Sequence, residues 1–108
     1  MPPLDATFAA LADPTRRAIL ARLATGPATV NELVRPFSMS QPAITKHIHV
    51  LEEAGLVTRS REGRHRPVHL APEGLQEADR YLDGFRALWE ARYAQLDQVL
   101  AEMNQNKP

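Results

Sequence analysis

Apolar residues recur at helical spacing in the middle of the chain, where residues 40–53 predict an amphipathic helix. Ser40 is a suitable N-cap, and Pro42 fits the first turn, where a missing N–H has no cost. Gly55 predicts the end of the helix. The inward-facing stripe, with spacings of four and three residues, consists of Ile44, Ile48 and Leu51.

The opposite face of this helix is polar, with short side chains near its start. A polar outer face is the ordinary property of a surface helix. Here, however, the short side chains would let the helix enter a DNA major groove about 12 Å wide. The candidate DNA contacts on this helix are Ser40, Gln41, Pro42, Thr45, Lys46 and His49.

A second, shorter helix is predicted just upstream. Thr29 and Glu32 have the T-x-x-E spacing of a capping box. Pro36 disfavours helical backbone at Arg35, so this helix should end near Arg35. The few residues that remain before Ser40 make the pair a predicted helix-turn-helix.

A basic hairpin is predicted downstream, from residue 56 to residue 70. Residues 56–61 are strand-like, Glu62 and Gly63 predict a tight turn, and Pro67 restricts the returning strand to a sheet edge or a strand end. Arginine runs are usually a solvated face, but beside such a helix contact with DNA phosphates is favoured. The candidate contacts on the hairpin are Arg59, Arg61, Arg64, His65 and Arg66.

The distribution of charge supports this interpretation more than the total does. The chain is neutral overall, with 13 basic and 13 acidic residues. Residues 14–66 nevertheless hold nine Lys/Arg against four Asp/Glu, a local net charge of +5. This is a local basic footprint rather than a general attraction to polyanions.

The N-terminal region is also helical by pattern. Asp13 and Pro14 form an N-cap followed by a proline at the first helical position, and this helix should reach about Thr25. Three basic residues on it, Arg16, Arg17 and Arg22, are predicted to be structural ion-pair partners in preference to phosphate contacts.

Residues 72–103 predict one long C-terminal helix. A helix of about 30 residues spans about 45 Å, whereas a domain of this size has a radius of gyration of about 13 Å. The uncovered apolar stripe therefore predicts a second copy of the chain as its partner, unless the helix folds back or frays beyond Leu96. Gly84 is compatible with a bend or with close packing across a dimer. The predicted dimer contacts are Phe8, Leu11, Leu82, Phe85, Trp89, Leu96, Val99 and Leu100.

The composition limits the remaining possibilities. With 108 residues, 44% of them apolar, the chain predicts a single compact domain over residues 1–108. It has no cysteine, no apolar run of membrane length and no signal-like N-terminus, which predicts a soluble cytoplasmic protein without disulfides or membrane contact. No nucleophile–base group, metal-ligand spacing or glycine-rich phosphate loop is evident, so we expect neither an enzyme nor a cofactor or metal.

Two long motifs resemble the ArsR-type family of bacterial transcriptional repressors. They read ALADPTRRAIL over residues 10–20 and MSQPAITKH over residues 39–47, the second continuing through VLEEAGLV at 50–57. The resemblance covers roughly residues 5–100. It implies a mainly α winged helix-turn-helix fold with a small β-hairpin wing, whose long N- and C-terminal helices form a dimer interface. It further implies a homodimer that binds double-stranded, pseudo-palindromic operator DNA and represses transcription.

The chain differs from the metal-sensing members of the family that it resembles. Their cysteine pair falls in the helix that here reads ELVR at residues 32–35, and the last helix contains no histidine. The sequence leaves open what would release the protein from DNA: a small organic ligand near Tyr81, Trp89 or Tyr93, a protein partner, or no inducer at all. A winged-helix module that binds protein instead of DNA is the alternative function.

Overall fold

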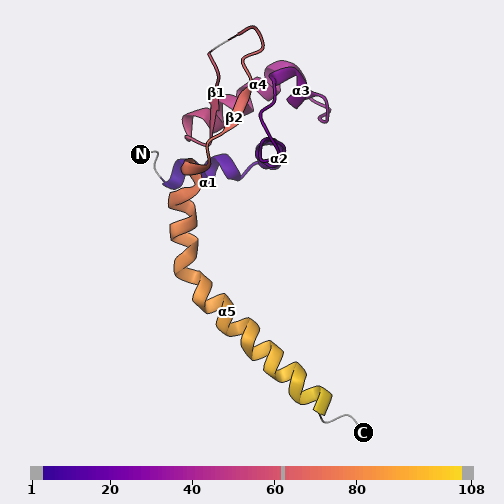
Figure 1. Cartoon of the computed structure of the whole chain (residues 1–108), viewed down its shortest axis with the longest axis vertical. Coiled ribbons are helices and arrows are strands. Elements are labelled where there is room, and N and C mark those ends of the chain that lie inside the picture. Colours follow the sequence, from indigo (N-terminus) through magenta and orange to yellow (C-terminus); the bar gives the residue numbers. More distant parts are fainter. Residues whose placement is uncertain (1–3, 62, 106–108) are drawn as a thin grey trace. The chain divides into compact units, whose positions relative to one another are not determined.

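The structure, a computed structural model, describes residues 4–61 and 63–105. It is mainly helical with one two-stranded antiparallel hairpin (Figure 1), which confirms the predicted fold class. The elements in chain order are α1 (Leu4–Leu11), α2 (Pro14–Leu23), α3 (Val30–Val34), α4 (Gln41–Glu53), β1 (Val57–Arg59), β2 (Val68–Leu70), the 3-10 helix η1 (Pro72–Leu75) and α5 (Gln76–Gln105).

The chain divides into two units, Met1–Ala78 and Asp79–Pro108, each described by itself. The first unit contains α1 to α4, the hairpin, η1 and the start of α5. The second consists, as far as it is described, of the remainder of α5. Among the described residues, no helix is both long and apolar enough to cross a membrane.

Local capping explains where α2 and α3 begin. The Asp13 carboxylate accepts a hydrogen bond from the Arg16 N–H at 3.0 Å, so it satisfies one of the free donors at the start of α2. Thr29 and Glu32 form the predicted capping box. The Thr29 hydroxyl accepts from the Glu32 N–H at 3.2 Å, and the Glu32 carboxylate accepts from the Thr29 N–H at 3.3 Å.

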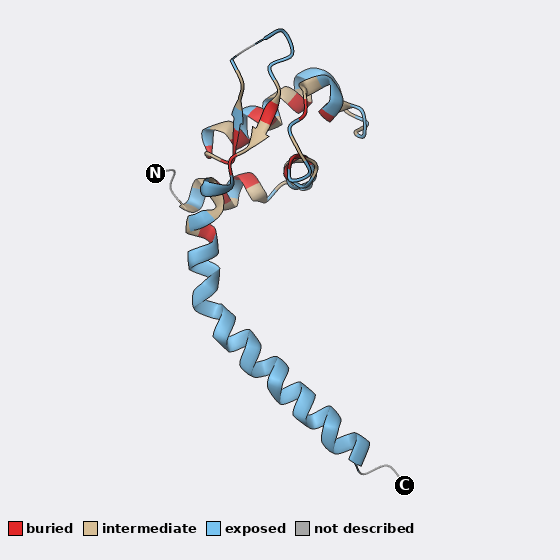
Figure 2. Cartoon of the chain, in the orientation of Figure 1, coloured by how far each residue is buried: buried red, intermediate tan, exposed pale blue. Residues whose placement is uncertain are grey.

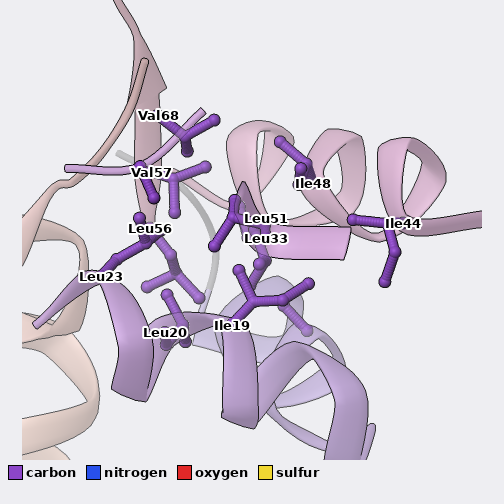
Figure 3. Packing of buried hydrophobic residues seen from close by; sticks show 13 residues of the cluster. Ile19, Leu20, Leu23, Leu33, Ile44, Ile48, Leu51, Leu56, Val57 and Val68 are labelled. Atoms are coloured by element: carbon purple, nitrogen blue, oxygen red, sulfur yellow. The ribbon is translucent and has the colours of Figure 1, made fainter. Parts of the chain in front are cut away.

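The hydrophobic core lies within the first unit and holds its elements together (Figure 3). The apolar stripe of α4 is fully buried there, as its spacing predicts. Figure 2 shows the buried residues collected in this unit. The buried cluster consists of Ala10, Ile19, Leu20, Leu23, Ala28, Leu33, Ile44, Ile48, Leu51, Ala54, Leu56, Val57 and Val68.

The hairpin is wider than the sequence predicts. A tight turn at residues 62–63 would place Arg59 opposite Arg66, but Arg59 pairs with Val68, and residues 60–67 connect the strands. The predicted length of the turn was wrong, but Gly63 does adopt a positive φ of 78°, as such a turn requires of its glycine; Glu62 itself lies outside the described residues. Two backbone features account for the difference: Pro67 has no N–H for a strand ladder, and Arg66 has a left-handed φ of 38°.

A contact distant in sequence ties the hairpin to the helices. The Val68 N–H donates to the Ala28 carbonyl at 2.7 Å, and the Ala28 N–H donates to the Val68 carbonyl at 3.1 Å. Because Ala28 directly precedes the Thr29 cap, the start of α3 is fixed against β2.

Candidate nucleic-acid interface

The helix α4 has one apolar face turned inward and one polar face on the surface. Its start is capped by Ser40, whose Oγ accepts a hydrogen bond from the Ala43 N–H at 3.3 Å. After its last residue, Gly55 adopts a φ of 77°, a left-handed conformation that favours glycine and ends the helix. The predicted contact residues are exposed, apart from the half-buried Thr45; they are Ser40, Gln41, Pro42, Thr45, Lys46 and His49.

The connection between the two strands carries the other predicted contacts. We call β1, β2 and residues 60–67 between them the wing. Arg61, Arg64, His65 and Arg66 are all exposed on it. The predicted residues of α4 and of the wing thus lie on the surface of the same unit.

Arg59 differs from the other arginines of the wing. Its side chain is only 26% exposed, and its Nε and Nη2 atoms are buried without a hydrogen-bond partner among the described residues. Such a group needs a nearby opposite charge. The Glu52 carboxylate supplies it, 3.9 Å from Nε. Arg59 therefore faces the end of α4, at the base of the wing.

Glu52 connects the wing to the polar face of α4. One of its carboxylate oxygens is 3.7 Å from His49 Nδ1, and the other is the oxygen that lies near Arg59. These are ion-pair distances, longer than hydrogen bonds. Sequence patterns alone assign Glu52 no role beyond solvated helix surface. The available signal was its i, i+3 spacing from His49, which places both residues on one side of the helix.

A surface hollow of about 250 Å³ joins the wing to the starts of α3 and α4. Its walls bring basic side chains of the wing together with polar groups near the two helix starts. The lining residues are Thr29, Val30, Asn31, Gln41, Arg59, Arg64, His65 and Arg66. This combination suits an anionic ligand that approaches both elements at once.

Two carboxyl groups near these elements have lowered pKa values. The hydrogen bond from the Arg16 main-chain N–H lowers the pKa of Asp13, and the positive charge of the Arg16 side chain lowers it further. The hydrogen bonds from the Thr29 N–H and hydroxyl lower the pKa of Glu32. Both groups are therefore held in the ionised form that caps a helix.

The three arginines of α2 bind within the protein. Arg22 forms the predicted ion pair, 3.8 Å from the Glu32 carboxylate. Arg16 and Arg17 donate to main-chain carbonyls near the end of α1, and the charge of Arg16 also acts on the nearby Asp13 carboxylate. The last carbonyls of a helix lack partners within the helix and attract guanidinium donors.

No group of three or more histidine and carboxylate side chains in residues 4–61 and 63–105 is arranged to hold a metal ion. His47 lies 3.2 Å from the Arg16 guanidinium and His49 lies near Glu52, so both have partners within the protein.

An exposed polar helix beside a basic hairpin, on one shared core, defines a winged helix-turn-helix domain. Comparison with known proteins agrees: a family described as "Helix-turn-helix domain" matches residues 11–60. The HTH-type transcriptional regulator Rv2034 of Mycobacterium tuberculosis is 45% identical over 92 residues, which cover 85% of this chain and 86% of that protein. The transcriptional repressor SdpR of Bacillus subtilis is 30% identical over 82 residues, which cover 76% of this chain and 91% of that protein.

Solved structures show the same similarity. The ArsR family transcriptional regulator RHA00566 superposes with a TM-score of 0.72 at 46% identity, covering 81% of this chain and 96% of that one. The winged helix-turn-helix DNA-binding domain of Mb0332 from Mycobacterium bovis is described as homodimeric. It gives a TM-score of 0.61 at 25% identity, and the match covers 94% of this chain and 81% of that one. The chain belongs to the ArsR-type family of winged helix-turn-helix transcriptional regulators.

Proposed function

We propose that this chain is a cytoplasmic, homodimeric repressor that binds a pseudo-palindromic operator at its own gene or a neighbouring operon. Its activity is binding to double-stranded DNA and not catalysis. The observation that carries the proposal is the exposed polar face of α4 beside the exposed arginines of the wing. Family membership and the similarity to SdpR, a named repressor, support repression as the outcome of binding.

In this proposal α4 is the recognition helix and lies in the major groove. Thr45 and His49 are about 40° apart around the helix, so both can reach base edges from one side. Lys46 would contact the phosphate backbone. Ser40, Gln41 and Pro42 enter first, because they stand at the helix start, and Gln41 is able to pair with adenine.

The wing contacts the flanking DNA backbone. Arg61, Arg64 and Arg66 supply positive charge from exposed positions, and His65 lies between two of them. Arg59 has a different role, because Glu52 faces its guanidinium. We expect Arg59 to hold the base of the wing against α4 and to contribute less to phosphate binding.

The dimer is built from α5 with help from α1. Leu82, Trp89, Leu96 and Met103 are spaced seven residues apart, the repeat that suits packing of one helix against another. All four are exposed. The homodimeric state described for the Mb0332 domain supports a second copy as the partner. The proposed contacts are Phe8, Leu11, Leu82, Phe85, Trp89, Leu96, Val99 and Leu100.

Residues 1–108 would then act as one DNA-binding domain. Residues 29–54 form its helix-turn-helix, residues 56–70 its wing and residues 72–103 its dimerisation helix. Two copies would present their recognition helices to half-sites about 34 Å apart, one turn of DNA.

Fluorescence anisotropy tests the proposal directly. The purified protein is titrated against labelled DNA from its own promoter region, over a range of salt concentrations and with unrelated DNA as competitor. We expect affinity to fall steeply with salt and the promoter to be preferred by about a thousandfold or more. Weak and equal binding to both DNAs would contradict the proposal and favour a protein-binding winged-helix module.

A further inference from the structure

Arg16, in the first turn of α2, reaches two other helices with its guanidinium group. Nε donates to the Ala10 carbonyl at 2.7 Å, and Nη2 donates to the Ala9 carbonyl at 3.0 Å, both near the end of α1. Nη1 lies 3.2 Å from Nδ1 of His47, in the middle of α4. One side chain therefore joins α1, α2 and the proposed recognition helix.

The chemistry of this contact determines the protonation of His47. A guanidinium group has only donors, so His47 Nδ1 must accept the hydrogen bond and cannot carry a proton. The imidazole is then neutral, with its proton on Nε2. The Asp13 carboxylate, 3.9 Å from the same Nδ1, is another charged group near this pair. This carboxylate balances the positive charge of the Arg16 guanidinium. It also accepts a hydrogen bond from the main-chain N–H of Arg16.

The position of His47 on α4 gives this contact its consequence. At about 100° per residue, Thr45 and His49 each lie about 160° around the helix from His47. A bond that fixes His47 toward α2 therefore directs Thr45 and His49 away from the core. Rotation of α4 about its axis would break this bond and move both side chains.

We infer that Arg16 is a positioning residue that sets the rotation of α4 through His47, and so determines how well the helix discriminates between DNA sequences. This inference rests on the proposed function, because it assumes that α4 recognises bases. Arg16 itself touches α1 and α4 and needs no contact with DNA.

Two substitutions at His47 form a matched pair. His47→Asn places an amide oxygen close to the position of Nδ1, so it keeps an acceptor for Arg16, and asparagine has about the same helix propensity as histidine. His47→Leu removes the acceptor and keeps similar bulk. Arg16→Lys keeps the charge but loses the forked geometry. Arg17→Ala is the control on the same helix, because Arg17 donates to the Leu11 carbonyl of α1.

Binding is measured by anisotropy at pH 8, on variants of the whole chain that circular dichroism shows to be folded. We expect His47→Leu and Arg16→Lys to lose about tenfold of the preference for promoter over unrelated DNA. The salt dependence should stay unchanged, since every phosphate-binding side chain is kept. His47→Asn and Arg17→Ala should remain within about twofold of the unchanged protein. The inference would be overturned if His47→Leu, His47→Asn and the unchanged protein all preferred promoter over unrelated DNA to the same degree.

Nitrogen-15 NMR of the imidazole rings provides a measurement that does not involve DNA. We expect His47 to show a protonated Nε2 and an unprotonated Nδ1, and to lose this fixed tautomer in Arg16→Lys. A protonated Nδ1 in the unchanged protein would overturn the inference even if operator binding is specific. Absence of any sequence preference in the unchanged protein would instead overturn the proposed function, and the role of Arg16 in recognition with it.

Discussion

At the scale of single residues, two glycines differ in the space around their Cα atoms. A Cβ on Gly74 would collide with the Gly55 carbonyl oxygen and lie 3.2 Å from Leu56 Cα. A Cβ on Gly84 would meet nothing within 4 Å. The same substitution should therefore have opposite effects at the two positions.

We expect Gly74→Ala to lower the free energy of unfolding by about 1–3 kcal/mol, because backbone has to move to make room. Gly84→Ala should raise it by about 0.5–1 kcal/mol, because alanine is the better helix former. Urea denaturation followed by circular dichroism measures both. If Gly84→Ala weakened self-association instead, Gly84 would be a site of close packing between two copies.

Asp13 gives the stability a predictable dependence on pH. Its pKa is lowered in the folded chain, first by the hydrogen bond from the Arg16 N–H. A lowered carboxyl pKa contributes stability above the unfolded value of about 4, and this contribution disappears as the pH falls through the lower folded value. Asp13→Asn keeps the helix cap but removes the titrating group. As the pH falls from 5 to below the folded pKa of Asp13, we expect this variant to lose less stability than the unchanged protein does. Thermal unfolding at a series of pH values tests this, and identical pH profiles would contradict it.

At the scale of elements, the wing should determine how binding depends on salt. Removing one side chain that neutralises a phosphate should make the slope of log affinity against log salt shallower by about 0.9, and by about 1.8 in a dimer that carries the substitution in both copies. We therefore expect Arg61→Ala, Arg64→Ala and Arg66→Ala each to flatten the slope measured by anisotropy. Arg86→Ala in α5, where Arg86 pairs with Asp79 and Asp83, is the control and should leave the slope unchanged.

Arg59→Ala distinguishes a structural arginine from a phosphate-binding one. If Arg59 chiefly neutralises Glu52, its removal should lower stability and change the salt slope less than Arg64→Ala does. An equal reduction of the slope by the two substitutions would show that Arg59 also contacts DNA.

The helices were predictable because their signals are local. Ser40, Asp13 and the pair Thr29–Glu32 cap helices through groups three residues away, and the structure confirms each of these starts. The apolar stripe of α4 follows from helical period alone. Such features need no knowledge of the rest of the chain.

The register of the wing was not predictable in the same way. It depends on the left-handed backbone of Arg66 and on pairing between Val68 and Ala28, which are 40 residues apart. The internal partners of Arg16 and Arg59 likewise come from other helices or strands. A sequence pattern identifies these side chains as basic, but only the fold decides which of them turn inward.

At the scale of the whole molecule, the second unit presents an apolar surface that the structure leaves open. Between Asp79 and Gln105 every described residue is exposed, Trp89 and Leu96 by 45% and 54%. Exposed apolar area of this kind marks an interaction surface, and the seven-residue spacing along it favours another helix as the partner. A second copy of α5 meets both conditions.

A charge on this surface should prevent the proposed dimer from forming without affecting the fold of the first unit. We expect Leu96→Asp to be monomeric at micromolar concentration in analytical ultracentrifugation. Gln98→Asp is the matched control, because Gln98 lies about 160° around the helix from Leu96 and carries the same substitution on the other face. It should remain dimeric.

The same pair of variants connects assembly to DNA binding. Two linked recognition helices hold an operator more tightly than one, by about 10²–10⁴ where the geometry allows both to bind. Leu96→Asp should therefore lose at least about a hundredfold in affinity for a full operator. Its affinity for an isolated half-site, which one copy occupies, should equal that of the unchanged protein. If Leu96→Asp bound the full operator with unchanged affinity, a single copy would be the functional unit, and the exposed stripe of α5 would serve a different partner.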